Sequence, residues 1–200
     1  MAPATEYAFG DDWFFLRCRG CHAISIKHEY WHSADLGPDD KPSRTTEFFP
    51  SRVSRKTPDW QNSMDFIMMC PIEVNNLLHE LYICLRNGCA ASATMLVRSI
   101  LEQMMIEKVG DHGSFKANLA QLQTHDFVSG MQREFIETAL EAGHASIHRA
   151  YVPSPMDLTT LVDILEGIIQ AVYVHSNQAS VLKKRIPPRS TAIAKGKPKK

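Results

Sequence analysis

The sequence lacks several features, and each absence excludes a class of protein. It has no run of about 18 apolar residues, so no transmembrane helix and no membrane partner are expected. Its N-terminus places acids before the aromatics and has no basic segment, so we expect no secretory signal. It has only five cysteines, an odd number without regular spacing, which excludes a disulfide scaffold and favours a reducing cytoplasm. P-loop, GxGxxG, GxSxG and kinase motifs are absent.

The net charge is also near zero, but the charges are unevenly distributed. Residues 183–200 carry eight Lys and Arg and no acid, while the rest of the 200-residue chain has 22 acids and 14 bases. A proline-rich segment with unpaired positive charge does not pack, so residues 183–200 are predicted to be a disordered tail. Such a tail is expected to add salt-dependent affinity for nucleic acid through its cations, beginning with Lys183, Lys184, Arg185 and Arg189.

The remaining chain divides into two parts. Residues 1–70 hold all three tryptophans and five of the eleven prolines, with short apolar pieces between turn signals such as 36–40. This composition predicts a few short strands with long loops, forming an irregular, ribbon-like cap. Residues 71–182 have the spacing of amphipathic helices. The predicted fold is therefore mainly α: a bundle of four to five helices with a small N-terminal β cap packed on it.

Local signals place the individual helices. Pro71 suits a first turn, Gly88 and Gly110 are stop signals, and Ser154-Pro155 combines a capping serine with a proline at the first helical position. The segment after Gly88 is apolar on nearly every face, so it should be the central helix. The expected helices cover 71–87, 89–109, 114–122, about 130–145, and 155 to about 182.

The N-terminal part contains one CxxC motif, Cys18 and Cys21. Two thiolates at this spacing can hold a tetrahedral zinc, with His28 and His32 as candidate further ligands. A structural site needs four ligands, and no second CxxC follows. The other interpretations are a ribbon-like hairpin without metal, or redox use. We therefore expect no cofactor, with a zinc at Cys18 and Cys21 as the alternative.

The helical part has two polar features among apolar residues. Arg98 and Glu102 are one turn apart on the central helix, and His144 and His148 share a face of the next long helix, followed by Arg149. One interpretation is structural: Arg98 and Glu102 form a half-buried pair that ties two helices together. The other is a polar site that reaches across the bundle, in which a histidine acts as acid or base.

Three motifs of this chain, in the same order, resemble the DUF4145 family, a domain of unknown function. Residues 98–102 (RSILE), preceded by Gly88, resemble the family's "G…lRxxLE" segment, and residues 142–154 (AGHASIHRAYVPS) resemble its "GNxAxH…P" segment. Residues 49–52 (FPSR) and 58–60 (PDW) resemble the "yPxR … PxW" run of a subgroup with a CxxC-bearing N-terminal piece.

The family is similar to HEPN domains, which are small helical bundles of bacterial defence systems. The resemblance implies a HEPN-like bundle, a homodimer and, in many members, metal-independent RNA cleavage by an Arg-x4-6-His motif. His148 matches the motif histidine, but the arginine window holds Glu141, Ala142 and Gly143 instead. The chain departs from the catalytic pattern at that point.

Two functions follow. The first is a non-catalytic HEPN-like interaction module, dimeric through the apolar stripe of residues 158–172, that binds nucleic acid or a protein partner. The second is a ribonuclease whose rearranged site uses His144, His148, Arg149 and Arg98, with Glu102 holding Arg98.

Overall fold

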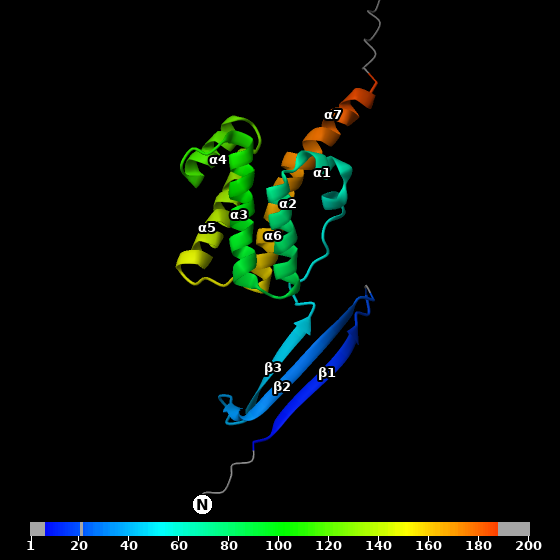
Figure 1. The fold of residues 1–200 in the computed structure, drawn as a ribbon, viewed down its shortest axis with the longest axis vertical. Helices are drawn as coiled ribbons and strands as arrows, with labels where there is room; N and C mark the ends of the chain where they lie inside the picture. The colour runs from blue at the N-terminus through cyan, green and yellow to red at the C-terminus, as the bar shows by residue number, and fades with distance from the viewer. Residues whose placement is uncertain (1–6, 21, 188–200) are drawn as a thin grey trace, which may run out of the picture.

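The computed structural model describes residues 7–20 and 22–187, which form a helical bundle and a three-stranded sheet (Figure 1). The elements, in chain order, are β1 (Phe9–Arg17), β2 (Ile24–Leu36), β3 (Pro42–Phe49), η1 (Asp59–Asn62), α1 (Met64–Met69), α2 (Ile72–Arg86), α3 (Ala90–Val109), α4 (Phe115–Thr124), α5 (Gly130–His148), α6 (Pro155–Gln170), η2 (Ala171–His175) and α7 (Ser176–Arg185).

The three strands form an antiparallel sheet in the order β1-β2-β3. The predicted turn at 36–40 joins β2 to β3, and the Gly37 amide donates to the Lys41 carbonyl at 2.8 Å. The strands are longer than the short pieces expected from sequence: β1 has nine residues, β2 has 13 and β3 has eight. Residues directly opposite each other share a face, so the register assigns the apolar side chains to the two faces of the sheet. Phe14, Leu16, Trp31 and Phe48 lie on one face, and seven others lie on the opposite face. These are Phe9, Trp13, Phe15, Ile24, Ile26, Tyr30 and Phe49.

The sheet does not cover the bundle. It extends from one end of the helices, and no strand packs extensively against a helix (Figure 1). Phe15 is 81% exposed and Phe9 is 77% exposed, although both are large apolar residues. The sequence predicted that residues 1–70 form a cap packed on the bundle, but the strands instead extend away from it. We call β1, β2 and β3 (residues 9–49) the sheet arm.

Residues 51–70 connect the sheet arm to the bundle and do pack on the helices. The Ser51 amide donates to the Arg86 carbonyl at 2.9 Å, and its hydroxyl donates to the Leu85 carbonyl. Phe66 of α1 is fully buried, with its ring 5.1 Å from the Trp60 ring. The helical unit thus begins before residue 71.

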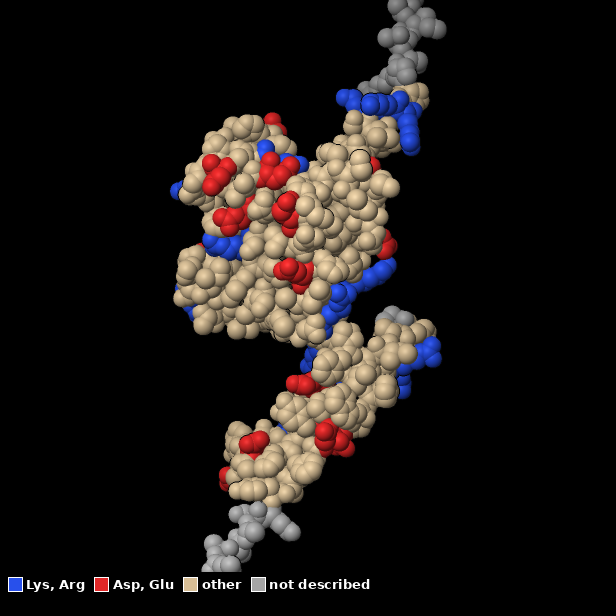
Figure 2. Space-filling model, viewed as in Figure 1, with Lys and Arg blue, Asp and Glu red and all other residues tan. Residues whose placement is uncertain are grey.

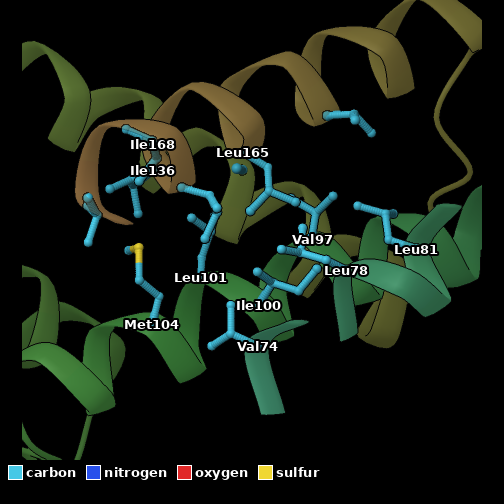
Figure 3. Close-up of a cluster of buried hydrophobic side chains, with 14 of the residues drawn as sticks. Val74, Leu78, Leu81, Val97, Ile100, Leu101, Met104, Ile136, Leu165 and Ile168 are labelled. Atoms are coloured by element: carbon cyan, nitrogen blue, oxygen red, sulfur yellow. The ribbon is translucent and has the colours of Figure 1, made fainter. Parts of the chain in front are cut away.

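The core of the bundle surrounds α3, which contacts α2, α4, α5 and α6. This confirms the central position expected for an apolar segment. Side chains from these helices meet in one continuous cluster (Figure 3), including Val74, Leu78, Leu81, Val97, Ile100, Leu101, Met104, Ile136, Leu165 and Ile168. The fold is mainly helical with a small N-terminal sheet.

The sequence signals act where they were expected. Gly88 and Gly110 adopt positive φ at helix ends, at 73° and 82°, where a Cβ would be strained. Ser154 caps α6, and Asp157 completes a capping box with it. A second capping box, formed by Ser129 and Gln132, starts α5, which runs three residues beyond the predicted end at 145.

The last helix is continuous from Pro155 to Arg185 through the π-helical η2. By length and composition it could cross a membrane, but half of its apolar window is buried in the bundle, and core packing accounts for that apolarity. The stripe of residues 158–172 is buried within the chain itself. The helix includes Lys183, Lys184 and Arg185, so the predicted tail begins later than residue 183. Arg189 lies outside the described residues.

Candidate functional site

A groove between α3, α4 and α5 brings together several of the residues singled out from the sequence. It encloses about 490 Å³ and is lined by Arg98, Phe115, Lys116, Leu119, Glu137, Leu140, Glu141 and His144. We call it the helical groove. Its polar side chains come from three elements, and its floor comes from the core face of α4 and α5.

Arg98 crosses from α3 toward α5 at the base of the groove. Its guanidinium lies over the Phe115 ring, 3.9 Å from the centroid, and Nη1 donates to the Leu140 carbonyl at 3.3 Å. The crossing depends on Gly143: a Cβ built there would lie 2.5 Å from the Arg98 Cβ. The small residues before His144 therefore permit a close approach of α5 to α3, and Arg98 ties the two helices together.

Glu102 does not hold Arg98, and that expectation is corrected. Among residues 7–20 and 22–187, no group forms a hydrogen bond or ion pair with the Glu102 carboxylate. Partial burial raises the pKa of Glu102, and the charge of Arg98 opposes that increase. The physical reason is that the guanidinium finds an aromatic face and a carbonyl on neighbouring helices, so it turns away from its own helix.

His144 and His148 lie on the exposed face of α5 with ring centroids 4.5 Å apart. Arg149 follows directly, and it forms an ion pair with Glu141 rather than pointing at the imidazoles. The hydrogen bond from Arg149 lowers the pKa of the Glu141 carboxyl. The structure thus brings the two histidines together and neutralises the nearest arginine.

The chemistry available in the helical groove follows from these contacts. Metal-independent RNA cleavage needs an imidazole to move a proton and a cation directed at the phosphate. Arg98 is engaged with Phe115 and Leu140, and Arg149 is engaged with Glu141. The groove is lined by two cations, Arg98 and Lys116. Lys116 of α4 forms no hydrogen bond, ion pair or cation–π contact with the residues that the structure describes.

The predicted zinc ligands are separated by the sheet. His28 and His32 lie four and eight residues along β2 from Ile24, about 13 Å and 26 Å at the usual rise per residue. They cannot join the Cys18 knuckle in one metal site. Within residues 7–20 and 22–187, no cluster of three His, Cys, Asp or Glu could hold a metal ion. Cys21 lies outside the described residues, so zinc at the CxxC stays a prediction.

His28 has a different role, which the sequence did not indicate. Its Nε2 lies 2.8 Å from Asp11, its Nδ1 lies 3.6 Å from Glu47, and its ring stacks on Trp13 at 3.8 Å. The imidazole therefore joins all three strands. Only the strand register could have revealed this, because these residues are far apart in the sequence.

A second polar network missed by the sequence analysis lies on the opposite side of the core. Tyr82 of α2 donates to Glu166 of α6, and Arg55 of the connector pairs with Glu166 at 3.1 Å and with Asp163 at 2.7 Å. Burial raises the pKa of Glu166 and of the Tyr82 hydroxyl. This network anchors the connector to the bundle.

The fold and the groove define a class: a helical domain with a polar groove between three helices and an N-terminal sheet extension. The model of the family described as Domain of unknown function (DUF4145) matches residues 79–185, more than half of the chain. The chain belongs to this family, as its motifs indicated. The match covers the helices from within α2 onward and omits the sheet arm. Searches of curated proteins and of solved structures found no match.

Proposed function

We propose that this protein is a non-catalytic, HEPN-like interaction module that acts in the cytoplasm as a homodimer and binds a nucleic acid or protein partner. The observation that carries the proposal is the engagement of two arginines: Arg98, which lines the helical groove, and Arg149, which pairs with the groove residue Glu141. Arg98 is held by Phe115 and Leu140, and Arg149 is held by Glu141. A phosphate that approached His148 would meet the Arg149–Glu141 pair, in which the positive charge is already neutralised.

The direct test is incubation of the purified protein with end-labelled RNA in EDTA. We expect no cleavage above that of a His148→Ala control. Cleavage by the wild type that His148→Ala abolishes, with an unchanged melting temperature, would overturn the proposal.

One observation favours the second candidate, a metal-independent ribonuclease with a rearranged site. His144 and His148 form a close exposed pair, and Lys116 is available on the facing helix. In that function Lys116 would replace the missing motif arginine. Loss of cleavage in Lys116→Gln, with retention in Lys108→Gln, would support it; Lys108 is already engaged with Glu107 and the Tyr173 ring.

The dimer in this proposal uses a surface other than the stripe of residues 158–172, which is buried. An exposed apolar patch covers α1 and the first turn of α2: Met64, Ile67, Met68, Met69 and Ile72. Light scattering at micromolar concentration should give twice the monomer mass. Met68→Glu with Ile72→Glu should give the monomer mass, because two charges would be buried unpaired at the interface. A monomeric wild type would reject the dimer.

A further inference from the structure

The turn between α2 and α3 brings two cysteines together. The Cys89 amide donates to the Cys84 carbonyl at 3.0 Å, and the Gly88 amide donates to the Leu85 carbonyl at 3.3 Å. These two bonds, with Gly88 at a φ of 73°, form a Schellman motif that ends α2. Cys84 lies three residues before the cap residue, Asn87, and Cys89 lies two residues after it. We call Cys84 and Cys89 the turn dithiol.

The backbone of the turn has the spacing that a disulfide needs. Side chains at these two positions of a Schellman motif frequently contact each other. A main-chain hydrogen bond keeps the two α-carbons on the order of 5–6 Å apart, as it does between paired strands. A disulfide spans about 4.4–6.8 Å between α-carbons. Burial raises the pKa of the Cys84 thiol, and the charge of Cys89 raises it further, so the two sulfurs are close enough to interact.

The two thiols differ in their access to solvent. Cys89 is exposed, and its Sγ lies 3.9 Å from the Asn87 carbonyl oxygen, at the end of α2. Cys84 is half-buried and packs against the core cluster. A dissolved oxidant therefore meets Cys89 first, and Cys84 reacts from within the protein. This makes Cys89 the attacking thiol and Cys84 the resolving thiol.

The surface around the turn is positively charged. Figure 2 shows Lys and Arg side chains gathered on the bundle side of the junction with the sheet arm. Arg86, three residues before Cys89, is exposed and forms no ion pair with any residue that the structure describes. Arg52 of the connector is nearby, because the preceding Ser51 amide donates to the Arg86 carbonyl at 2.9 Å. Such cations attract an anionic oxidant, and oxidised glutathione is a small disulfide with net negative charge.

We propose that the turn dithiol is a redox modification site, which an anionic small-molecule disulfide such as oxidised glutathione converts into an intramolecular disulfide. The Cys89 thiolate attacks one sulfur of the oxidant, whose S–S bond breaks, and one glutathione leaves and takes up a proton. Cys84 then loses its proton and attacks the Cys89 sulfur, which releases the second glutathione as a thiol. Two cysteine thiols are oxidised, and one glutathione disulfide is reduced to two thiols. The site does not depend on the proposed function.

The full chain allows a direct test, because trypsin cleaves after Arg86, between the two cysteines. Cys84 then lies in peptide 57–86 and Cys89 in peptide 87–98. After treatment with oxidised glutathione, alkylation and digestion, the monomer band of a non-reducing gel should yield these two peptides linked, and reduction should separate them. Peptide 57–86 also contains Cys70, so Cys70→Ala is the control and should give the same linked pair. Linkage that Cys70→Ala abolishes would overturn the proposal.

The order of attack is tested by the two single variants. Cys84→Ala should stop at the mixed disulfide, with one glutathione on peptide 87–98, because no resolving thiol remains. Cys89→Ala should keep Cys84 as a thiol, with at least about tenfold less glutathione bound over the same time, because Cys84 is half-buried. Equal modification of the two variants, or glutathione retained on Cys89 of the wild type, would overturn the pairing. Peptide 87–98 linked to a second copy of itself would also overturn it.

The preference for an anionic oxidant is tested by rate. In the Cys84→Ala background, Arg86→Gln should slow the addition of glutathione to Cys89 at least about twofold at low salt, because a steering charge is lost. Intact mass spectrometry measures the rate. The neutral bis(2-hydroxyethyl) disulfide is the matched control and should react equally fast with and without Arg86→Gln. Equal slowing with both oxidants, or no slowing with glutathione, would overturn the preference for an anion.

Discussion

The sheet arm holds eight of the chain's 17 Phe, Trp and Tyr residues within 41 positions, and it uses its aromatic rings in the opposite way to the helical bundle. In the bundle, Phe66, Tyr82 and Tyr173 are buried, and the two hydroxyls are satisfied by Glu166 and Glu107. In the sheet arm, Phe9 and Phe15 face outward. Burial of apolar area stabilises a fold, whereas exposed rings contribute little to it. The difference indicates that the bundle supplies stability and the sheet arm supplies a surface.

The largest expected effect compares one phenylalanine from each region. Phe66→Ala should lower the free energy of unfolding by about 3–5 kcal/mol, because it leaves a cavity beside Trp60 and Tyr173. Phe15→Ala should change it by less than about 0.5 kcal/mol, as exposed substitutions do. Urea titration measures both. Similar losses in the two variants would mean that the sheet arm shares the stability of the core.

The second prediction concerns the helix crossing at Arg98. Gly143→Ala should destabilise by about 1–3 kcal/mol, since the new Cβ would overlap the Arg98 side chain. Gly167→Ala is the matched control on α6, where nothing lies within 4 Å of the new methyl. It should stabilise by about 0.4–1 kcal/mol through helix propensity. A neutral Gly143→Ala would show that the close approach of α5 to α3 is not required.

A third prediction concerns pH, and it again applies to the bundle. Burial raises the native pKa of Glu166 above its ordinary value. Its contribution to stability is therefore fully present below the ordinary glutamate pKa and declines as pH rises through the native pKa. Glu166→Gln should remove this decline, so the stability of wild type relative to the variant should fall as the pH rises from the ordinary glutamate pKa through the raised pKa of Glu166. Thermal melts of both proteins at a series of pH values measure this difference; a difference that rises with pH would show that the Arg55 pair outweighs burial.

The smallest effect should come from removing the sheet arm. A variant that begins at Ser51 retains the connector, its hydrogen bonds to α2 and the Arg55 network. Its free energy of unfolding should differ from that of the full chain by less than about 0.5 kcal/mol, because no strand packs extensively on a helix. A loss of several kcal/mol would make the two regions one cooperative unit.

The sequence by itself determined most of the helices of the bundle. Capping by Ser154 and Pro155, the stops at Gly88 and Gly110 and the apolar segment between them act over a few residues, so their effects are visible in the chain order. The sequence also determined which polar residues of α5 cluster, because His144 and His148 are one helical turn apart. It did not reveal α1, whose six residues give too short a pattern.

Only the tertiary structure decided how these parts are used. The contacts of Arg98 with Phe115 and Leu140, of His28 with Asp11 and Glu47, and of Ser51 with Arg86 each join segments that are distant in the sequence. The direction of a long side chain depends on which neighbour offers a ring face, a carbonyl or a carboxylate. Local spacing contains no information about that neighbour. For the same physical reason, the separation of the sheet arm from the bundle became visible only once the helices were packed.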